Sequence, residues 1–365
     1  MLKHPPKKDI YAIYIRFCLS ECNLQEILRK LEGIIWLDEL QVHFKRLLVF
    51  STCKFDLLLE RLYTTSCTED LYLVIDELDL EHFLTSKDMQ HRVSSIIASL
   101  LLGRSSFNID FLDLGRKLTP ETKRELREEL IKKVKQLLGS RELRVSRSSP
   151  SIDFKLILLE PGKVLLSVVL KKFRKDRFQY RWTEKRPYSQ PSSLTPYHAL
   201  VLFNVSFDSS PDISSSLEYR KVLLDPFLGT GSILIEAALQ GVYGVGIDLS
   251  YRQIRGAKRN LNQLDLLPLV DLVISDSTHL PLRKDSLAAV AFDPPYGRLA
   301  STYKRTPSLL LRTSLESVKI TLKKPGKAVF LAVDGNKPRN SAASKICDIL
   351  EHGSLIRHLY VMENA

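Results

Sequence analysis

The sequence predicts an α/β fold with a mainly parallel sheet in its C-terminal half, preceded by an α+β N-terminal half. Between residues 221 and 335, short apolar runs alternate with helix-like segments, and each run ends near a carboxylate or a turn. This alternation is typical of parallel strands that are connected by helices. The runs predicted as strands are KVLLD, GVGID, LVIS, AVAFD and KAVFLAV. Because ligands of such sheets gather at the carboxyl ends of the strands, we expect the functional site there.

Length and charge limit the class of protein. The 365 residues are enough for two or three domains, each with its own core. The net charge of +12 favours a polyanionic partner, although it also fits a membrane surface. No apolar run reaches the roughly 18 residues that span a bilayer, and the basic N-terminus lacks the pattern of a signal peptide. We therefore expect a cytoplasmic protein.

The cysteines predict no chemistry of their own. They are odd in number and scattered, without CxxC spacing: Cys18, Cys22, Cys53, Cys67 and Cys347. This pattern indicates reduced thiols and not a disulfide framework. We expect no metal site.

The N-terminal half begins with a small α+β unit. Residues 10–17 and 44–51 are predicted as strands, and they flank a helix at about 23–32 whose leucines and isoleucine recur at helical spacing. A second α+β region starts near residue 70. Residues 153–170 close it with two β-rich runs separated by Pro-Gly, which predicts a hairpin.

Two helices are predicted inside this second α+β region, at about 88–102 and 119–138. The later one has signals at both ends, because Thr119 can cap it, Pro120 suits its first position and Gly139 suits its end. Its predicted apolar stripe consists of Leu126, Leu130, Val134 and Leu137. The basic residues on its other face are interspersed with acids, so we assign them no role.

A basic segment with interleaved aromatic residues follows at 171–187. Basic groups can pair with phosphates while aromatic rings stack on unpaired bases, so the segment predicts RNA contact. The alternative is an exposed edge strand and linker, where lysines discourage aggregation. The residues predicted to contact RNA are Lys171, Lys172, Arg174, Lys175, Arg177, Arg181, Arg186 and, directly after the run AVAFDPPYG, Arg298.

A glycine turn follows the first strand of the predicted parallel sheet, in the run KVLLDPFLGTGSILIEA. A turn of this kind brings backbone N–H groups close to a ligand. The next strand ends at Asp248, 19 residues after Gly229, where an acid commonly binds ribose hydroxyls. A nicotinamide or flavin site would have a third glycine in place of Leu234, and a phosphate-binding loop would have Gly-Lys-Ser in place of residues 231–233. Both nucleotide sites are therefore disfavoured.

The run AVAFDPPYG suits the methylation of an exocyclic amine on a nucleobase. Such an amine is a poor nucleophile, because its lone pair is delocalised into the ring. The Asp293 carboxylate and the Pro294 carbonyl can each accept one N–H, while the Tyr296 ring stacks on the base and both prolines stiffen the turn. The alternative for this run taken alone is a proline-rich turn after a buried strand.

The order of four motifs resembles that of S-adenosylmethionine-dependent amino-methyltransferases acting on nucleic acids: DPFLGTGS, GIDL, ISDSTHLP and DPPYG, over about residues 186–335. The resemblance implies S-adenosyl-L-methionine as cofactor, with Asp225 beside its ammonium group, Asp248 on the ribose and Asp276 on the adenine amine. The implied cofactor-binding residues are Leu194, Thr195, Pro196, Asp225, Phe227, Gly229, Thr230, Gly231, Ser232, Asp248, Leu249, Asp276 and Ser277. The implied catalytic residues are Asp293, Pro294, Pro295 and Tyr296.

A further run, RP…PSSL.P…AL..N, makes the resemblance narrower. Together with the four motifs it is similar to the archaeal THUMP-containing tRNA guanosine-10 N2-methyltransferases, which make N2-methyl- and often N2,N2-dimethylguanosine. A sister family that modifies guanosine 6 usually carries Asn where this chain has Asp293, which favours position 10. The implied partner is tRNA, and some relatives also work with a small zinc-binding activator protein.

The resemblance also implies how the domains are arranged. Helices closed by a hairpin in residues 70–170, ahead of a DPPY-type domain, resemble a THUMP domain, which binds tRNA. The predicted domains are a ferredoxin-like region (1–69), the THUMP domain (70–170), a basic linker (171–190) and a Rossmann-like methyltransferase domain (191–365).

Other functions remain open at this point. A DNA adenine-N6 methyltransferase would use the same motif order, but the THUMP-like half favours structured RNA. A non-catalytic RNA-binding subunit is also conceivable, although the motifs between Asp225 and Tyr296 are intact. A guanosine-6 tRNA methyltransferase is the nearest alternative.

Overall fold

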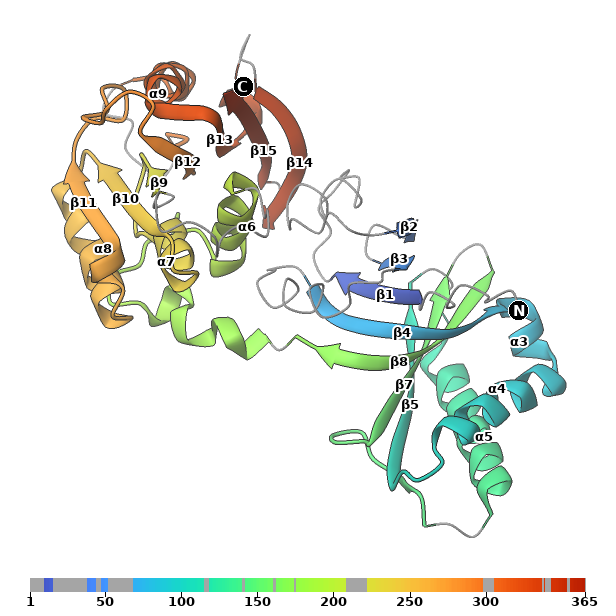
Figure 1. Ribbon diagram of the computed structural model, residues 1–365. Helices are drawn as coiled ribbons and strands as arrows, with labels where there is room; N and C mark the ends of the chain where they lie inside the picture. The colour runs from blue at the N-terminus through green and yellow to red at the C-terminus, as the bar shows by residue number, and fades with distance from the viewer. Residues whose placement is uncertain are drawn as a thin grey trace, which may run out of the picture. The chain divides into compact units, whose positions relative to one another are not determined.

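A computed structural model of the chain describes residues 10–15, 38–43, 47–51, 68–114, 118–139, 142–159, 162–173, 175–207, 222–297, 305–336, 338, 343–352 and 355–364. The chain forms two compact units. The described residues up to Phe173 belong to the first unit, and those from 175 onward belong to the second (Figure 1).

The first unit contains an eight-stranded sheet with the order β2-β3-β1-β4-β8-β7-β5-β6. Only the pairs of β5 with β6 and with β7 are parallel. The strands are β1 (Ile10–Ile15), β2 (Asp38–His43), β3 (Leu47–Ser51), β4 (Thr68–Asp79), β5 (Ser106–Asp113), β6 (Arg144–Val145), β7 (Ile152–Leu159) and β8 (Lys163–Lys172).

The long strand β4 joins the two parts that the sequence predicts as separate units. Its first half pairs with β1, and its residues from Asp70 to Asp79 pair with β8, so one continuous sheet contains strands from residues 1–69 and from 70–170. The predicted strands at 10–17 and 44–51 are confirmed over their described residues, 10–15 and 47–51, and the predicted hairpin is confirmed as the β7–β8 pair. The predicted helix at 23–32 lies outside the described residues.

Three helices of the first unit are α3 (Leu80–Thr85), α4 (Lys87–Leu100) and α5 (Pro120–Leu138). Helices α4 and α5 pack on one face of the sheet, where they share a core with strands β5, β7 and β8 (Figure 1). The predicted ends of α5 are confirmed, because the Thr119 hydroxyl accepts from the Thr122 N–H at 3.2 Å and Gly139 follows with a φ of 67°. The predicted stripe is wrong at Leu137, which is 43 % exposed. Leu138, four residues after Val134, packs against the core in its place.

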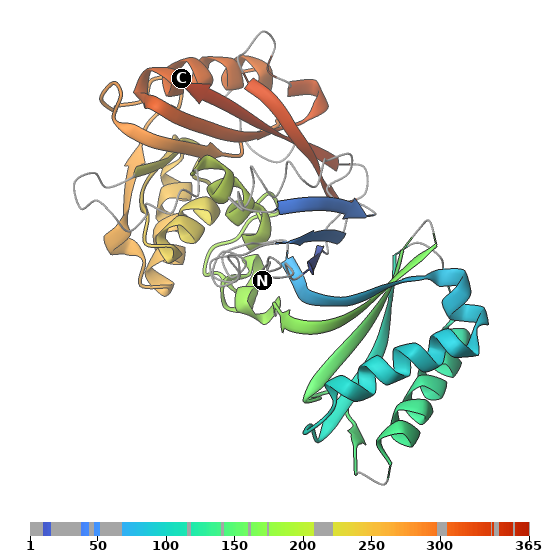
Figure 2. The same ribbon diagram turned by 45° about the vertical axis from the view of Figure 1, so that its right-hand side comes forward.

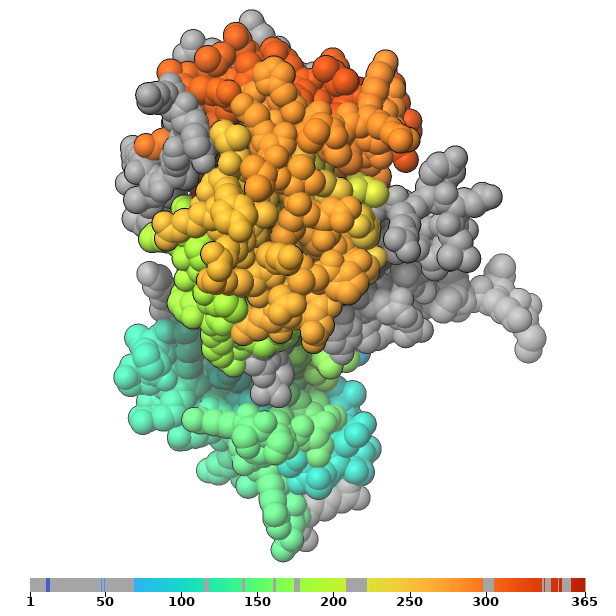
Figure 3. All heavy atoms as spheres, turned by 90° about the vertical axis from the view of Figure 1, so that its left-hand side faces the viewer, coloured from blue at the N-terminus to red at the C-terminus, as the bar shows by residue number. Residues whose placement is uncertain are grey.

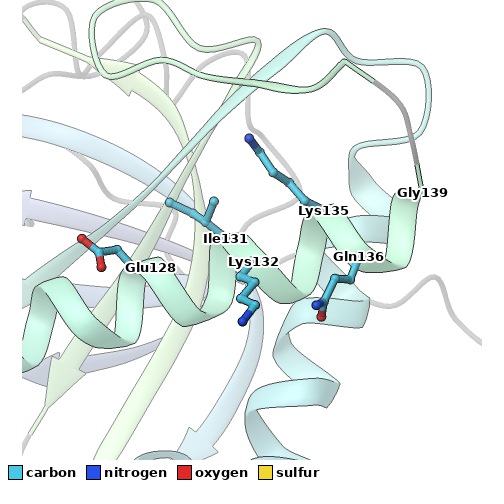
Figure 4. Close-up of a pocket in the computed structure, with 6 residues that line it drawn as sticks. All are labelled: Glu128, Ile131, Lys132, Lys135, Gln136 and Gly139. Carbon is cyan, nitrogen blue, oxygen red and sulfur yellow. The ribbon is translucent and has the colours of Figure 1, made fainter.

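A shallow hollow of about 580 Å³ lies along α5 in the first unit (Figure 4). Ile131 and Lys135 project to one side of the helix, and Lys132 and Gln136 project to the other. Apart from the half-buried Ile131, the residues that line the hollow are exposed. They carry charges of both signs, one acid and two lysines. These features fit a solvated helix surface, and we assign the hollow no function.

The second unit is a seven-stranded sheet with the order β11-β10-β9-β12-β13-β15-β14. Among the described strands of this sheet only β15 runs opposite to the others. This arrangement confirms the predicted mainly parallel α/β sheet. The strands are β9 (Val222–Asp225), β10 (Tyr243–Asp248), β11 (Val270–Ile274), β12 (Leu287–Phe292), β13 (Leu322–Ala332), β14 (Ala343–His352) and β15 (Leu355–Asn364).

Helices cover both faces of this sheet (Figure 2). Helix α9 (Pro307–Thr321) packs on the face where Leu224 and Phe292 point. Helices α6 (Pro196–Ser206), α7 (Ser232–Leu239) and α8 (Tyr251–Gln263) pack on the other face. Neighbouring residues of a strand point to opposite faces, so every strand of the middle of the sheet is buried on both sides. Burial on both sides explains why these strands are continuous apolar runs in the sequence and do not alternate between apolar and polar residues.

The segment before α6 contains two short 3-10 helices, Lys175–Arg181 and Thr183–Lys185. The residues predicted as a basic linker (171–190) are divided between the two units, since β8 extends to Lys172, Phe173 still belongs to the first unit, and residues 175–190 belong to the second. Tyr188 is anchored in that unit, because its N–H donates to the Asn260 side chain at 2.9 Å.

Gly256 of α8 leaves room for the Tyr188 ring. A Cβ on Gly256 would lie 2.0 Å from a carbon of that ring, and the ring is held in place by the Asn260 contacts and by the Tyr188 hydroxyl. Replacement of this glycine must therefore displace Tyr188.

We expect Gly256→Ala to destabilise the protein by about 1–3 kcal/mol, the usual cost of overpacking a well-filled site. Gly335→Ala is the matched control, since a Cβ there has nothing within 4 Å. Urea unfolding of both variants measures the difference. Equal stability of Gly256→Ala and wild type would mean that Tyr188 is free to move away.

Candidate active site

Four aspartates lie along one edge of the second unit's sheet. Asp225 ends β9, Asp248 ends β10, Asp276 follows β11 and Asp293 follows β12. All four strands are parallel, so their carboxyl ends meet at this edge (Figure 1). Strand β9 lies between β10 and β12, which is the point where the chain order of the sheet reverses and where such sheets bind ligands.

The glycine turn after β9 is tied to the end of β10. The Asp248 carboxylate accepts from the Gly229 N–H at 3.0 Å and from the Ser250 N–H at 2.8 Å. Gly229 and Gly231 have φ angles of 52° and 82°, a conformation that favours glycine. A Cβ on Gly229 would meet only the Phe227 carbonyl, at 3.8 Å, so this part of the turn is open. Burial raises the pKa of the Asp248 carboxyl group, and both backbone N–H groups oppose that rise.

Asp225 is the most deeply buried of the four aspartates, with 2 % of its surface exposed. Its side chain accepts from the Phe227 N–H at 3.1 Å. Burial raises the pKa of the Asp225 carboxyl group well above its usual value, and the nearby charges of Asp248 and Asp293 raise it further. A cation beside these carboxylates would be stabilised by all of them.

The predicted cofactor residues before α6 lie against the same turn. The Ser232 hydroxyl donates to the Leu194 carbonyl at 2.9 Å, Thr195 caps α6 by accepting from the His198 N–H, and Pro196 is the first residue of that helix. The carbonyl of Thr230 accepts from the Asn260 amide at 2.9 Å. The structure thus brings residues 194–196 and the turn 229–232 together.

Asp276 is engaged by a second side chain. The Arg305 guanidinium donates to both of its carboxylate oxygens, at 3.0 and 2.7 Å, and these hydrogen bonds lower the pKa of the Asp276 carboxyl group well below its usual value. Leu249 and Ile274 lie at the neighbouring strand ends and are 40 % and 54 % exposed. Ser277, also predicted, is buried and bonded to the Ser314 hydroxyl. Figure 3 looks onto the part of the second unit that contains α8 and β11, in yellow and orange.

Asp293 lies between an arginine and a tyrosine. The Arg357 guanidinium donates to its Oδ2 at 3.0 Å, and the Tyr296 hydroxyl donates to its Oδ1. The Asp293 and Arg357 side chains are 12 % and 9 % exposed. Pro294 is buried and Pro295 is half-buried, and Gly297 has a φ of 82°. The motif residues after β12 therefore form one small cluster, and Phe227 packs near it against Phe292.

Two of the arginines predicted to contact RNA are buried, which contradicts that prediction. Arg181 donates to both oxygens of the buried Glu236 carboxylate, at 2.7 and 2.9 Å. Arg186 donates to the Arg181 carbonyl and to the Ser232 hydroxyl, and burial lowers the pKa of its guanidinium to about 10. Groups that are used inside the protein in this way cannot also pair with phosphates.

The other predicted RNA contacts divide into two groups. Lys171 is half-buried, and Lys172 forms an ion pair with Asp153 that raises the pKa of the lysine. Arg174 and Arg298, and the side chains of Lys175 and Arg177, lie outside the described residues.

The pattern of the UPF0020 family, described as an RMKL-like methyltransferase domain, matches residues 184–349. These residues contain the four aspartates, the glycine turn and the cluster after β12. Residues 184–349 are therefore similar to an RMKL-like methyltransferase domain. The sheet of the second unit gives this region an α/β fold of the Rossmann-like class, as the sequence predicts.

Two curated relatives share part of this chain. A tRNA (guanine(10)-N2)-dimethyltransferase of Pyrococcus abyssi is 28 % identical over 243 residues, which cover 64 % of this chain and 69 % of that protein. The enzyme of the same name from Methanothermobacter thermautotrophicus is 32 % identical over 190 residues, which cover 52 % of this chain and 53 % of that protein. The chain thus matches only about half of the second relative's length.

The fold as a whole is similar to that of TrmN from Thermus thermophilus, with a TM-score of 0.60 and 17 % sequence identity. The comparison covers 98 % of this chain and the whole of the other. At this identity the similarity concerns the fold alone. None of the described helices is long and apolar enough to cross a membrane.

The sequence did not predict two residues of the site, Arg305 and Arg357. Each reaches a predicted aspartate from a distant part of the chain, 29 and 64 residues away. A lone arginine in the apolar strand LIRHLYVMEN was the available signal for Arg357. Arg305 carried no comparable signal.

Proposed function

We propose that this chain transfers a methyl group from S-adenosyl-L-methionine to the exocyclic N2 amine of guanosine in tRNA, with position 10 as the target. The observation that carries the proposal is the cluster after β12, where the Asp293 carboxylate lies beside Pro294 and Tyr296 at the edge of the sheet. The names of the two curated relatives support the substrate and the position.

The edge of the sheet fits the proposed cofactor. The cofactor carries positive charge at its sulfonium and ammonium groups. A cation of this kind suits a buried carboxylate with a raised pKa, such as Asp225. The open turn at Gly229 gives a ligand access to the backbone, and Asp248 is placed for the ribose. Leu249 and Ile274 offer apolar surface to the adenine ring. The Asp276 carboxylate would accept from the adenine amine in addition to the Arg305 guanidinium, from which it already accepts.

The cluster after β12 would activate the amine. The cofactor supplies an electrophilic methyl group. The Asp293 carboxylate and the Pro294 carbonyl each accept one N–H of the guanine amine, which turns the nitrogen lone pair toward that methyl group. Positive charge develops on the nitrogen as the bond forms, and the carboxylate stabilises it until the proton leaves to water. The base must first leave its stack in order to reach this position.

We propose that exposed cations supply the attraction for RNA. Helix α8 carries Arg252, Arg255, Lys258 and Arg259, all exposed, and it contains no acid. The net charge of +12 has the same sign. Contacts with several phosphates make binding weaken steeply as the salt concentration rises.

The proposal has further parts that rest on the resemblance. We assign tRNA recognition to a THUMP domain within the first unit, with residues 70–170 as its extent. A cytoplasmic location and a small zinc-binding activator as partner remain predictions. The number of methyl groups added depends on whether the pocket admits a substituted amine.

The test is mass spectrometry of nucleosides from tRNA transcripts that have been incubated with the full chain and the cofactor. We expect N2-methylguanosine in a transcript with guanosine at position 10, and none when that nucleotide is replaced by adenosine. A transcript changed at position 6 is the matched control and should still accept the methyl group. Methylation of duplex DNA, or of position 6 alone, would contradict the proposal.

Asp225 provides a separate test of the cofactor site. We expect Asp225→Asn to weaken cofactor binding about ten- to a hundredfold, because it removes a charged hydrogen-bond acceptor. At a pH where Asp225 is ionised, the same change should stabilise the protein without cofactor, since it removes a buried charge. Calorimetry and thermal unfolding measure the two effects, with Asp271→Asn as the exposed control.

The pH dependence follows from the raised pKa of Asp225. An acid whose pKa is raised in the folded state stabilises the fold below its unfolded pKa, and this contribution is lost as the pH rises through the folded value. Wild type should therefore lose stability relative to Asp225→Asn as the pH rises, while its affinity for the cationic cofactor increases. Cofactor affinity of Asp225→Asn equal to that of wild type would remove Asp225 from the site.

A further inference from the structure

Arg357 reaches the active-site edge because its strand is reversed. Strand β15 runs antiparallel to β13, so the start of β15 lies beside the carboxyl end of β13, with His358 opposite Ala332. Strand β12 is the other neighbour of β13, and Asp293 directly follows it. A residue at the start of β15 therefore lies near the ends of the parallel strands. Arg357 extends from there to Asp293, at 3.0 Å.

The two oxygens of Asp293 have different partners. Oδ2 accepts from Arg357, a group that belongs to the rigid sheet, and Oδ1 accepts from the hydroxyl of Tyr296 in the following loop. The Arg357 guanidinium also lies 5.8 Å from the centre of the Tyr296 ring. An incoming amine can displace a tyrosine hydroxyl more easily than a buried guanidinium, because the latter is charged and loses its counter-ion.

We propose that Arg357 is a positioning residue that fixes the Asp293 carboxylate through Oδ2 and leaves Oδ1 as the acceptor for the substrate amine. The Tyr296 hydroxyl holds the place of the amine until substrate enters. The inference rests on the proposed methyl transfer and adds a residue to it. It also explains how a carboxylate can lie near the buried Asp225, since Arg357 balances its charge.

The test is a double-mutant cycle with Arg357→Gln, Asp293→Asn and the combined variant. In Asp293→Asn the buried Arg357 guanidinium donates to the amide oxygen, which is then not available to the substrate amine. Arg357→Gln leaves the buried Asp293 carboxylate without its cation. We expect either change alone to slow single-turnover methyl transfer to tRNA by about tenfold or more. In the combined variant no carboxylate remains for residue 357 to position, and the two amides can bond each other, so its rate should be no lower than that of Asp293→Asn alone.

Arg357→Lys and a neighbouring control separate positioning from general damage. The lysine keeps the charge and should recover part of the rate. His358→Gln removes a buried side chain of the same strand that bonds Asp348 and Asp334 on the other face, so it should lower stability without changing the rate of the folded protein. Cofactor and tRNA affinities should remain within about threefold of wild type in all Arg357 variants.

The outcomes are distinct. Losses that multiply in the combined variant, or an Arg357→Gln rate equal to that of wild type, would overturn the positioning role. So would equal losses in rate and in cofactor affinity. If wild type transfers no methyl group to tRNA, the proposed function is wrong, but the inference about Arg357 is not yet tested by that result. The unfolding temperatures of the same cycle then decide the inference, since recovery of stability in the combined variant supports the pairing and additive losses refute it.

Discussion

Asp293→Ala should reduce the turnover of tRNA methylation by a hundredfold or more and leave the affinity for tRNA nearly intact. The Asp293 carboxylate is the acceptor that turns the amine toward the methyl group, and loss of one such acceptor commonly costs about two to three orders of magnitude in rate. The side chain is small, 12 % exposed and set at the end of β12, so it contributes little to the surface that binds RNA.

Single-turnover rates and filter binding, measured on the same preparation, test this prediction. Asp271→Ala is the matched control, since that aspartate is exposed at the start of β11. Equal losses in rate and in tRNA affinity would make Asp293 a docking residue. Because Asp293→Ala also leaves Arg357 without this carboxylate, thermal unfolding must show that the variant is folded.

The parts of the fold that could be predicted from sequence are those with local signals. The ends of α5 were predictable, because Thr119 and Gly139 act within one turn of the helix. The same applies to Asp225 and Asp248, which are the last residues of apolar strands. Since parallel strands share one edge for their carboxyl ends, their order alone brings these acids together.

The remaining parts depend on contacts between distant residues. Whether Arg357 reaches Asp293 depends on the reversed direction of β15, and a single strand-like run does not reveal its direction. The continuous sheet of the first unit depends in the same way on β4, whose length lets it pair with both β1 and β8. Neither feature leaves a local pattern.

The basic segment shows the opposite error, in which a local pattern predicts the wrong role. Interleaved arginines and aromatic rings suit RNA, but the same residues can fill an interior when an acid is available. For Arg181 that acid is Glu236, 55 residues later in the chain. The glutamate lies in a helix that reads as apolar, so its partner could not be deduced from the helix alone.

Arg181→Met should destabilise the protein by about 3–5 kcal/mol, because it leaves the Glu236 carboxylate buried without its guanidinium. Glu236 has 0 % of its surface exposed, and both of its oxygens accept from Arg181. The Arg181 side chain also lies over the Phe178 ring, at 4.6 Å from its centre, so packing is lost as well. Urea unfolding of the full chain measures the effect.

Two further variants distinguish this structural role from a role in RNA binding. Arg181→Met combined with Glu236→Leu removes both charges, and replacement of a buried ion pair by apolar groups is often close to neutral, so most of the stability should return. Lys185→Met, in the same segment but exposed, should leave stability unchanged. If Arg181→Met were as stable as wild type and bound tRNA more weakly, the buried pair would be dispensable and the segment would contact RNA through Arg181. Because the ion pair is buried and bidentate, we expect the reverse: Arg181→Met lowers stability, and the added Glu236→Leu substitution restores it.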